Sequence, residues 1–293
     1  MNRASPSAAP EQAERELLAE CALLAHRDAP ICCPDAVAAG HTCRLYHSVW
    51  PAARLIGMVA SPGADRAFWE SAMSALPAAN PRPRVLVSGA SDYAFPALVA
   101  ESLRQAGSLP RLHVIDRCET PLRLNRWYAE KTGLDLSTEC CDVLAFTATE
   151  PYDLICAHGF IDQLPAERWP ALMQRWRAAL KPGALAITSN RLRSAAEAEA
   201  DQHAAARPLG VTALLATANA GLPPSLQLPE QDFASNLERY WKQRRSPPFR
   251  DADSIIALFE SAGFAIVQRE EDVADAPGRR SRSRRLNLIA RRR

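Results

Sequence analysis

The sequence predicts an α/β fold in which helices cover both faces of a doubly wound, mostly parallel sheet. Apolar runs of strand length alternate with helix-like segments from Arg84 to Ser189, which is typical of parallel strands joined by crossover helices. The apolar run Tyr152–His158 is expected of a strand buried on both faces. Near the C-terminus, two strand-like segments follow a single helix with no helix between them. They predict a terminal hairpin, and therefore one antiparallel strand.

The alternation yields seven strands. They are predicted at Val85–Ser88, Leu112–Asp116, Leu136–Cys140, Tyr152–His158, Ala184–Ser189, Phe264–Arg269 and Leu286–Ala290. A helix-like segment separates the first two strands, and further helices are predicted at Pro121–Thr132, Ala166–Ala179 and Asp251–Ala262. The last strand is expected to run antiparallel between its neighbours, with Lys181-Pro182-Gly183 as the turn into the fifth strand.

The region before the sheet domain is predicted to be a tail and a helical cap. Residues 1–10 are polar and rich in Ala and Pro, so we expect a disordered tail. Residues 11–80 form the cap, with helices at Glu11–His26, Asp35–Val59 and Ala64–Leu76 and a break at Pro30–Pro34. Residues 81–293 form the sheet domain. An Ala-rich helical insert at 194–248 interrupts it, and we expect the insert and the cap to form a substrate chamber.

Composition indicates a soluble intracellular protein. The chain has 293 residues, 47% of them hydrophobic, which is enough for a large core. Its net charge of +2 gives no general attraction to nucleic acid or anionic membranes. No apolar run reaches membrane-spanning length, and the first ten residues lack the apolar core of a secretion signal. We therefore expect a cytoplasmic protein without nucleic-acid or membrane partners.

Two further patterns are assigned no functional site. The 8 cysteines include the adjacent pairs Cys32-Cys33 and Cys140-Cys141, which do not offer the CxxC spacing of an ordinary tetrahedral metal site. No metal is therefore expected, and no disulfide framework. The basic run Arg279–Arg285 lacks interleaved aromatic residues, so we expect a solvated loop rather than a nucleic-acid interface.

The stretch from Arg84 to Arg126 carries the strongest functional signal. An apolar strand ends in the small-residue turn Ser88-Gly89-Ala90-Ser91, a helix follows, and a second strand closes on Asp116. This order is that of a βαβ unit that binds an adenosine-type cofactor at the carboxyl edge of a parallel sheet. The acid can accept hydrogen bonds from ribose hydroxyls, although a helix N-cap is the alternative for the same carboxylate.

With these segments in place, the chain resembles the class I S-adenosylmethionine-dependent methyltransferases. The resemblance covers roughly Arg84–Arg193 and Asp251–Ala290, through VLVSGASDY, VID, CDVLAF, YDLICAHGFIDQLP and LKPGALAITS in that order. It implies a Rossmann-like methyltransferase domain with S-adenosyl-L-methionine as cofactor. The family usually has an acid at the position of Val87 and glycines at those of Ser91 and Tyr93. Only Gly89 remains here, so Asp92 or the cap would contact the amino-acid end of the cofactor.

The resemblance also implies a set of site residues. Asp116 would bind the ribose, and Asp142 with the Val143 backbone would contact the adenine. The full expected cofactor-binding set is Gly89, Ala90, Ser91, Asp92, Asp116, Arg117, Asp142, Val143, His158, Gly159 and Phe160.

His158 and Tyr93 are the candidate catalytic residues. A neutral imidazole at the carboxyl end of a central strand could accept a proton from the nucleophile, although a buried histidine bonded to a carbonyl explains the same position. Asp92 and Tyr93 are large polar residues at a tight turn, where ligand contact is expected and helix capping is the alternative. The candidate substrate or lid residues are Tyr46, His47, Trp50 and Arg191. Ordinary hydrophobic packing is the default explanation for Trp50.

The predicted function is methyl transfer from S-adenosyl-L-methionine to a small-molecule acceptor. One alternative keeps the cofactor but performs an intramolecular displacement, releasing methylthioadenosine and a cyclised amino acid such as an azetidine carboxylate. Another is a non-catalytic scaffold with the same fold. A nicotinamide dehydrogenase is less favoured because the three-glycine fingerprint is missing. The sequence leaves the acceptor atom and a homodimeric state open.

Overall fold

A computed structural model describes residues 8–33, 43–74, 80–192, 210–243, 251–274 and 283–293. A single seven-stranded sheet forms its centre, with the order β3-β2-β1-β4-β5-β7-β6. The strands are β1 (Arg84–Ser88), β2 (Arg111–Asp116), β3 (Leu136–Cys140), β4 (Tyr152–His158), β5 (Leu180–Leu192), β6 (Phe264–Ala274) and β7 (Ser283–Arg292). The first five are parallel, whereas β7 lies antiparallel between β5 and β6. The predicted fold class and the antiparallel last strand are therefore confirmed.

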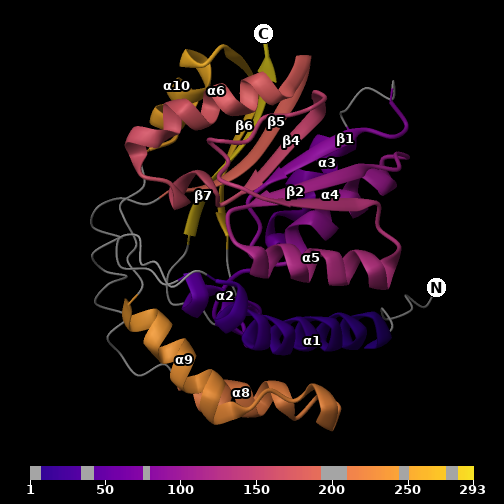
Figure 1. Ribbon diagram of the computed structural model, residues 1–293, viewed down its shortest axis with the longest axis vertical. Helices are drawn as coiled ribbons and strands as arrows, with labels where there is room; N and C mark the ends of the chain where they lie inside the picture. The colour runs from indigo at the N-terminus through magenta and orange to yellow at the C-terminus, as the bar shows by residue number, and fades with distance from the viewer. Residues whose placement is uncertain (1–7, 34–42, 75–79, 193–209, 244–250, 275–282) are drawn as a thin grey trace, which may run out of the picture.

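Helices cover both faces of the sheet, as the alternating sequence pattern requires (Figure 1). On one face, α3 (Arg66–Ser74), α4 (Ala94–Gln105) and α5 (Glu119–Thr132) enclose a core around Val85, Val87 and Val114. On the other face, α6 (Trp169–Ala179) and α10 (Ala252–Ser261) pack on Leu86 and Ile155. Successive side chains of a strand point to opposite faces, so alternate residues of β1 enter different cores.

Of the three helices predicted for the cap, α1 (Ala8–Cys32) lies along α5 and α2 (Cys43–Leu55) packs on α1 (Figure 1), whereas α3 packs on the sheet. The name cap is kept here for α1 and α2. The insert supplies α8 (Val211–Asn219) and α9 (Glu230–Gln243), which pack on the outer side of α1 and α2. A shared apolar cluster containing Val49, Leu215 and Phe233 joins the four helices. The cap and the insert therefore form one helical layer beside the sheet domain, while a chamber between them and the sheet stays a prediction.

Several predicted boundaries were wrong. The first helix continues through Pro30 to Cys32, so the missing N–H of this proline does not end it. Residues 8–10 are helical rather than part of a disordered tail. The second ends at Leu55 because Gly57 adopts a left-handed φ of 72°. The third begins at Arg66 and follows a 3₁₀ turn, Pro62–Asp65, capped by Ser61.

Three terminal or turn segments also differ from expectation. The predicted turn Lys181-Pro182-Gly183 is part of β5, where the pairing register with β4 shifts and Gly183 has a φ of 76°. Both strands of the terminal hairpin are longer than predicted, which moves Arg285 from the expected loop into β7. Ser283 and Arg284 of that loop also belong to β7. Residues 275–282, which include the remainder of the predicted loop, the tail 1–7 and the segment 193–209 lie outside the described residues. Among the described helices, none is long and apolar enough to cross a membrane.

Candidate functional site

The turn after β1 is shaped around Gly89. This residue has a φ of 78°, and its N–H donates to the carbonyl of Ile115 at 2.9 Å. A Cβ at this position would lie 2.0 Å from Cδ2 of Phe160, so the ring of Phe160 lies directly on the turn. Only glycine combines the left-handed backbone with so close an approach. The turn and the loop after β4, both predicted to bind cofactor, are therefore adjacent.

Asp116 ends β2 beside this turn. Its Oδ2 accepts the backbone N–H of Ala90 at 3.2 Å, and its Oδ1 accepts that of Cys118 at 2.8 Å. Burial raises the pKa of the Asp116 carboxyl, although these two hydrogen bonds and the nearby His47 oppose the shift. Each carboxylate oxygen has a second acceptor position. The side chain can therefore hold the turn and still accept hydrogen bonds from a ligand.

The cap reaches the same turn through Tyr46. Its hydroxyl lies 2.6 Å from Oγ of Ser91, and burial raises the pKa of the phenol. The Tyr46 ring packs against Trp50 at 4.8 Å and against Tyr240 of α9 at 5.8 Å between ring centroids. Two of the predicted lid residues therefore lie together, and one of them contacts a predicted cofactor-binding residue.

Asp92 and Tyr93 do not face an open site, contrary to the expectation that both side chains contact ligand. Asp92 pairs with Arg54 at 2.6 Å, in an ion pair whose side chains are 2% and 5% exposed, and it also accepts the N–H of Ala94 at the start of α4. Tyr93 is buried and stacks on Tyr128 with ring centroids 4.6 Å apart. The charge of Arg54 offsets the cost of burying the Asp92 carboxylate, and the phenol ring of Tyr93 fills the apolar space between α1 and α5. The catalytic role proposed for Tyr93 is withdrawn.

His158 stands at the carboxyl end of β4 and contacts residues from distant parts of the chain. Its Nε2 lies 2.9 Å from Oδ2 of Asp65, which belongs to the 3₁₀ turn before α3. The same Asp65 oxygen accepts Oγ–H of Ser189 at 3.0 Å and Nη1–H of Arg285 at 2.6 Å. The buried-histidine alternative named a backbone carbonyl as partner, and the structure gives the ring the Asp65 carboxylate in addition to a hydrogen bond with the backbone of His158 itself. Arg285 is consequently not part of a solvated loop.

The charges of this cluster act on both titratable groups. Burial lowers the pKa of His158, and the adjacent Arg285 adds to the effect, although the hydrogen bond with Asp65 opposes it. Burial favours the neutral form of Asp65, but the hydrogen bond with His158 and the charge of Arg285 outweigh it and hold the pKa of the carboxyl below its ordinary value. The cluster therefore favours a neutral imidazole beside an ionised carboxylate.

The remaining predicted residues are placed around the same edge. The carboxylate of Asp142 accepts the N–H of Leu144 at 2.9 Å and pairs with Arg168 at 3.0 Å, and the Leu144 bond is the main cause of its lowered pKa. Val143 is buried in the core, and Arg117 is exposed. Gly159 donates its N–H to the carbonyl of Ser189 at 2.8 Å, and Arg191 of β5 lies opposite Arg285 of β7.

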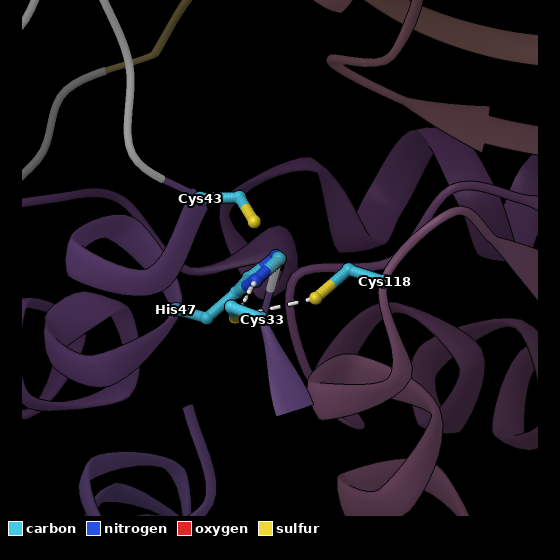
Figure 2. A group of neighbouring side chains, drawn as sticks. All are labelled: Cys33, Cys43, His47 and Cys118. Atoms are coloured by element: carbon cyan, nitrogen blue, oxygen red, sulfur yellow. Dashed lines mark hydrogen bonds between the residues drawn. The ribbon is translucent and has the colours of Figure 1, made fainter. Parts of the chain in front are cut away.

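His47 has a different neighbourhood from the other lid residues. It is buried and points into a group of three thiols, those of Cys33, Cys43 and Cys118 (Figure 2). The adjacent pairs Cys32-Cys33 and Cys140-Cys141 lack CxxC spacing, but the fold brings one member of the first pair, Cys33, close to two cysteines from other segments. The expectation that the protein binds no metal stays a prediction, but the fold brings together four side chains of the types that bind metals.

Comparison with known proteins identifies the fold. No protein-family model and no curated protein matches the sequence. Among solved structures, the chain is similar to the N-methyltransferase NodS from Bradyrhizobium japonicum WM9, in complex with S-adenosyl-L-homocysteine, at 15% identity over 85% of this chain and 98% of that one, with a TM-score of 0.50. An S-adenosylmethionine-dependent methyltransferase from Methanosarcina mazei matches at 12% identity over 73% and 93%, also with a TM-score of 0.50.

A third similar structure is described for the conversion of a disulfide bond into a thioacetal group during echinomycin biosynthesis. It is 18% identical over 80% of this chain and 83% of that one, with a TM-score of 0.50. Identities this low establish the architecture rather than the reaction. The sheet order, the antiparallel seventh strand and these similarities together show that the chain has the fold of class I S-adenosylmethionine-dependent methyltransferases.

Proposed function

We propose that the protein binds S-adenosyl-L-methionine at the turn between Gly89 and Asp116 and transfers its methyl group to a small-molecule acceptor. The observation that carries the proposal is the carboxylate of Asp116, which ends β2 and is bonded to the N–H of Ala90 in the turn after β1. Sheets of this type bind nucleotide-like ligands outside the carboxyl ends of their strands.

The residues present fit this cofactor. Asp116 keeps acceptor positions for two ribose hydroxyls, because each of its oxygens accepts only one described backbone hydrogen bond. Asp142 lies two residues after the end of β3, and its side chain is 44% exposed. Its carboxylate can therefore still accept a hydrogen bond from the adenine amino group. The aromatic side chain of Phe160, at the turn itself, is suited to cover the adenine or the sulfonium.

The cofactor supplies a methyl group that its sulfonium already activates, so the chain has little covalent chemistry to perform. Its residues would align the acceptor with the methyl and exclude water. Tyr46 would help to exclude water, because its hydroxyl holds the cap against Ser91. His158 would act at the reacting centre: with Nε2 held by Asp65, Nδ1 of the neutral ring would accept a proton from an acceptor oxygen or nitrogen, and Asp65 would stabilise the resulting imidazolium.

Thermal unfolding with added ligands tests cofactor binding. S-adenosyl-L-homocysteine at about 100 times its dissociation constant should stabilise the protein by about 2.7 kcal/mol and raise the melting temperature by several degrees, whereas NAD⁺ should not. Equal, negligible shifts with both ligands would support the non-catalytic scaffold instead.

Product analysis then tests the reaction. The protein would be incubated with S-adenosyl-L-methionine and a protein-free extract of small metabolites, and the nucleoside products quantified by mass spectrometry. Methyl transfer predicts S-adenosylhomocysteine, at a rate that depends on the extract. Methylthioadenosine as the main product would instead indicate the intramolecular displacement.

A further inference from the structure

Four metal-binding side chains converge beside the candidate cofactor site. The Sγ atoms of Cys33, Cys43 and Cys118 and a ring nitrogen of His47 all lie within 4.8 Å of one another. Figure 2 shows the four side chains pointing toward a common centre from three separate segments of the chain. Three of the residues are buried, and Cys43 is partly exposed. A set of three thiols and one imidazole is a ligand set of structural zinc sites.

The backbone explains why these side chains meet. Cys33 follows α1 directly, and its N–H still donates to the carbonyl of Ala29 at 3.0 Å. Cys43 is the first residue of α2, and His47 comes four residues later, so both lie on the same face of that helix. Cys118 is the N-cap residue of α5. The cap thus supplies three of the ligands, and the sheet domain supplies the fourth.

The separations suit a tetrahedral ion. Two thiolates each about 2.3 Å from zinc lie about 3.8 Å apart in tetrahedral geometry. The Sγ of Cys33 lies 3.3 Å from that of Cys118 and 3.3 Å from Nδ1 of His47. Small side-chain rotations would therefore bring these atoms to ligand distances. The two sulfurs are not bonded to each other, because both cysteines are free.

Cys33 also contacts a hydroxyl from outside the four proposed ligands. Its Sγ has three polar neighbours, namely His47, Cys118 and Thr120, whose Oγ1 lies at 3.2 Å. A metal-bound thiolate accepts well, and the hydroxyl of Thr120 could donate to it. Such outer-shell donors commonly orient metal ligands.

We propose that Cys33, Cys43, His47 and Cys118 together bind one zinc ion, which fastens the cap to the sheet domain. All four positions of a tetrahedral ion would be filled by protein ligands, so the ion would be structural rather than catalytic. Its effect would extend to the candidate cofactor site, because the N–H of Cys118 donates to Asp116 at 2.8 Å. That extension rests on the proposed function, whereas zinc binding itself does not.

Metal analysis of the full-length protein, prepared with zinc and dialysed, tests the proposal. We expect about one zinc per chain in the wild type. The sharpest comparison is between neighbours: C33S should lose the metal, whereas C32S, which changes the adjacent thiol outside the cluster, should retain it. C118S should behave like C33S. Full zinc occupancy in both C33S and C118S would overturn the proposal.

Cobalt substitution tests the ligand set without relying on any variant to fold. In the wild type, Co²⁺ should give the intense visible bands of tetrahedral coordination together with thiolate-to-metal charge-transfer absorption in the near ultraviolet. Addition of zinc should abolish both. Weak octahedral bands, or the finding by mass spectrometry of a Cys33–Cys118 disulfide in place of metal in the purified protein, would overturn the assignment.

Discussion

Asp65 and His158 lie 93 residues apart in the sequence, yet Oδ2 of Asp65 and Nε2 of His158 are 2.9 Å apart. Asp65 comes from the turn between the cap and the sheet domain, and His158 ends a central strand. Arg285 joins them from the antiparallel seventh strand, with Nη1 2.6 Å from the same carboxylate oxygen. The cluster therefore ties the N-terminal and C-terminal parts of the chain to the edge where ligands are expected.

The first prediction concerns the stability of this cluster. Asp65→Ala should lower the free energy of unfolding by about 3–5 kcal/mol, because it leaves the charge of Arg285, whose side chain is 12% exposed, without its buried partner. Urea unfolding would measure the change. Asp253→Ala removes the partner of Arg269 in an exposed ion pair and should cost less than about 1 kcal/mol. Equal effects of the two substitutions would contradict the burial argument.

The second prediction concerns pH. The folded protein holds the pKa of His158 below its ordinary value of about 6.5, mainly through burial, so the unfolded chain binds the proton more readily. The stability that this group contributes is complete above about pH 6.5 and is lost as the pH falls below it. Between pH 7 and pH 5, wild-type stability in urea should fall more steeply than that of His158→Gln. Parallel curves would show that His158 does not titrate differently on folding.

The sheet could be predicted from the sequence because its information is local. Apolar runs in the sequence predict the parallel strands. The antiparallel pair is predicted because no helix separates the two final strands. The residues at which helices end were harder to predict from the sequence. Pro30 was taken as a break, yet the helix runs on to Cys32, and the end at Leu55 depends on the left-handed Gly57.

The site was predicted only where neighbouring residues define it. Gly89 and Asp116 stand out in the sequence because each lies at the carboxyl end of a predicted strand. By contrast, Asp65 follows an ordinary Ser-Pro-Gly turn, and Arg285 belongs to a basic run. Nothing local reveals that these two meet. The spacing of Cys43 and His47, four residues apart, indicates that both could lie on one face of a helix. Cys118 lies 71 positions beyond His47, and only the fold brings it near them.

The third prediction uses two glycines with similar backbones. Gly89→Ala and Gly107→Ala both place a side chain at a left-handed φ, 78° and 83° respectively, which costs about 1–2 kcal/mol. The Cβ at position 107 would meet nothing within 4 Å, whereas that at 89 would meet Phe160 at 2.0 Å. Gly89→Ala should therefore destabilise by a further 1–3 kcal/mol, roughly the cost of overpacking. Chemical denaturation compares them, and Phe160→Ala should relieve part of the difference. Equal losses at the two positions would contradict the close approach.

The fourth prediction addresses the contact between the cap and the turn. Tyr46→Phe removes only the hydroxyl that lies 2.6 Å from Oγ of Ser91. The change should weaken S-adenosylhomocysteine binding by about fivefold, equivalent to about 1 kcal/mol, because the turn loses one fixed contact. Fluorescence or calorimetric titration would measure the affinity, with circular dichroism as a check on folding. If Tyr46→Phe binds S-adenosylhomocysteine as tightly as the wild type does, the contact between the cap and the turn does not contribute to cofactor binding.

The central claim is that Asp116 binds the cofactor, and calorimetric titration of S-adenosylhomocysteine into wild-type, Asp116→Ala and Asp135→Ala proteins tests it most directly. Asp135 lies outside the candidate site, where its carboxylate pairs with Arg82 at 3.1 Å, and serves as the control. Loss of two ribose hydrogen bonds to a charged acceptor should cost about 2–4 kcal/mol, or about 30- to 700-fold in affinity, at position 116 only. Wild-type affinity in folded Asp116→Ala protein, or no binding by the wild type, would contradict the account.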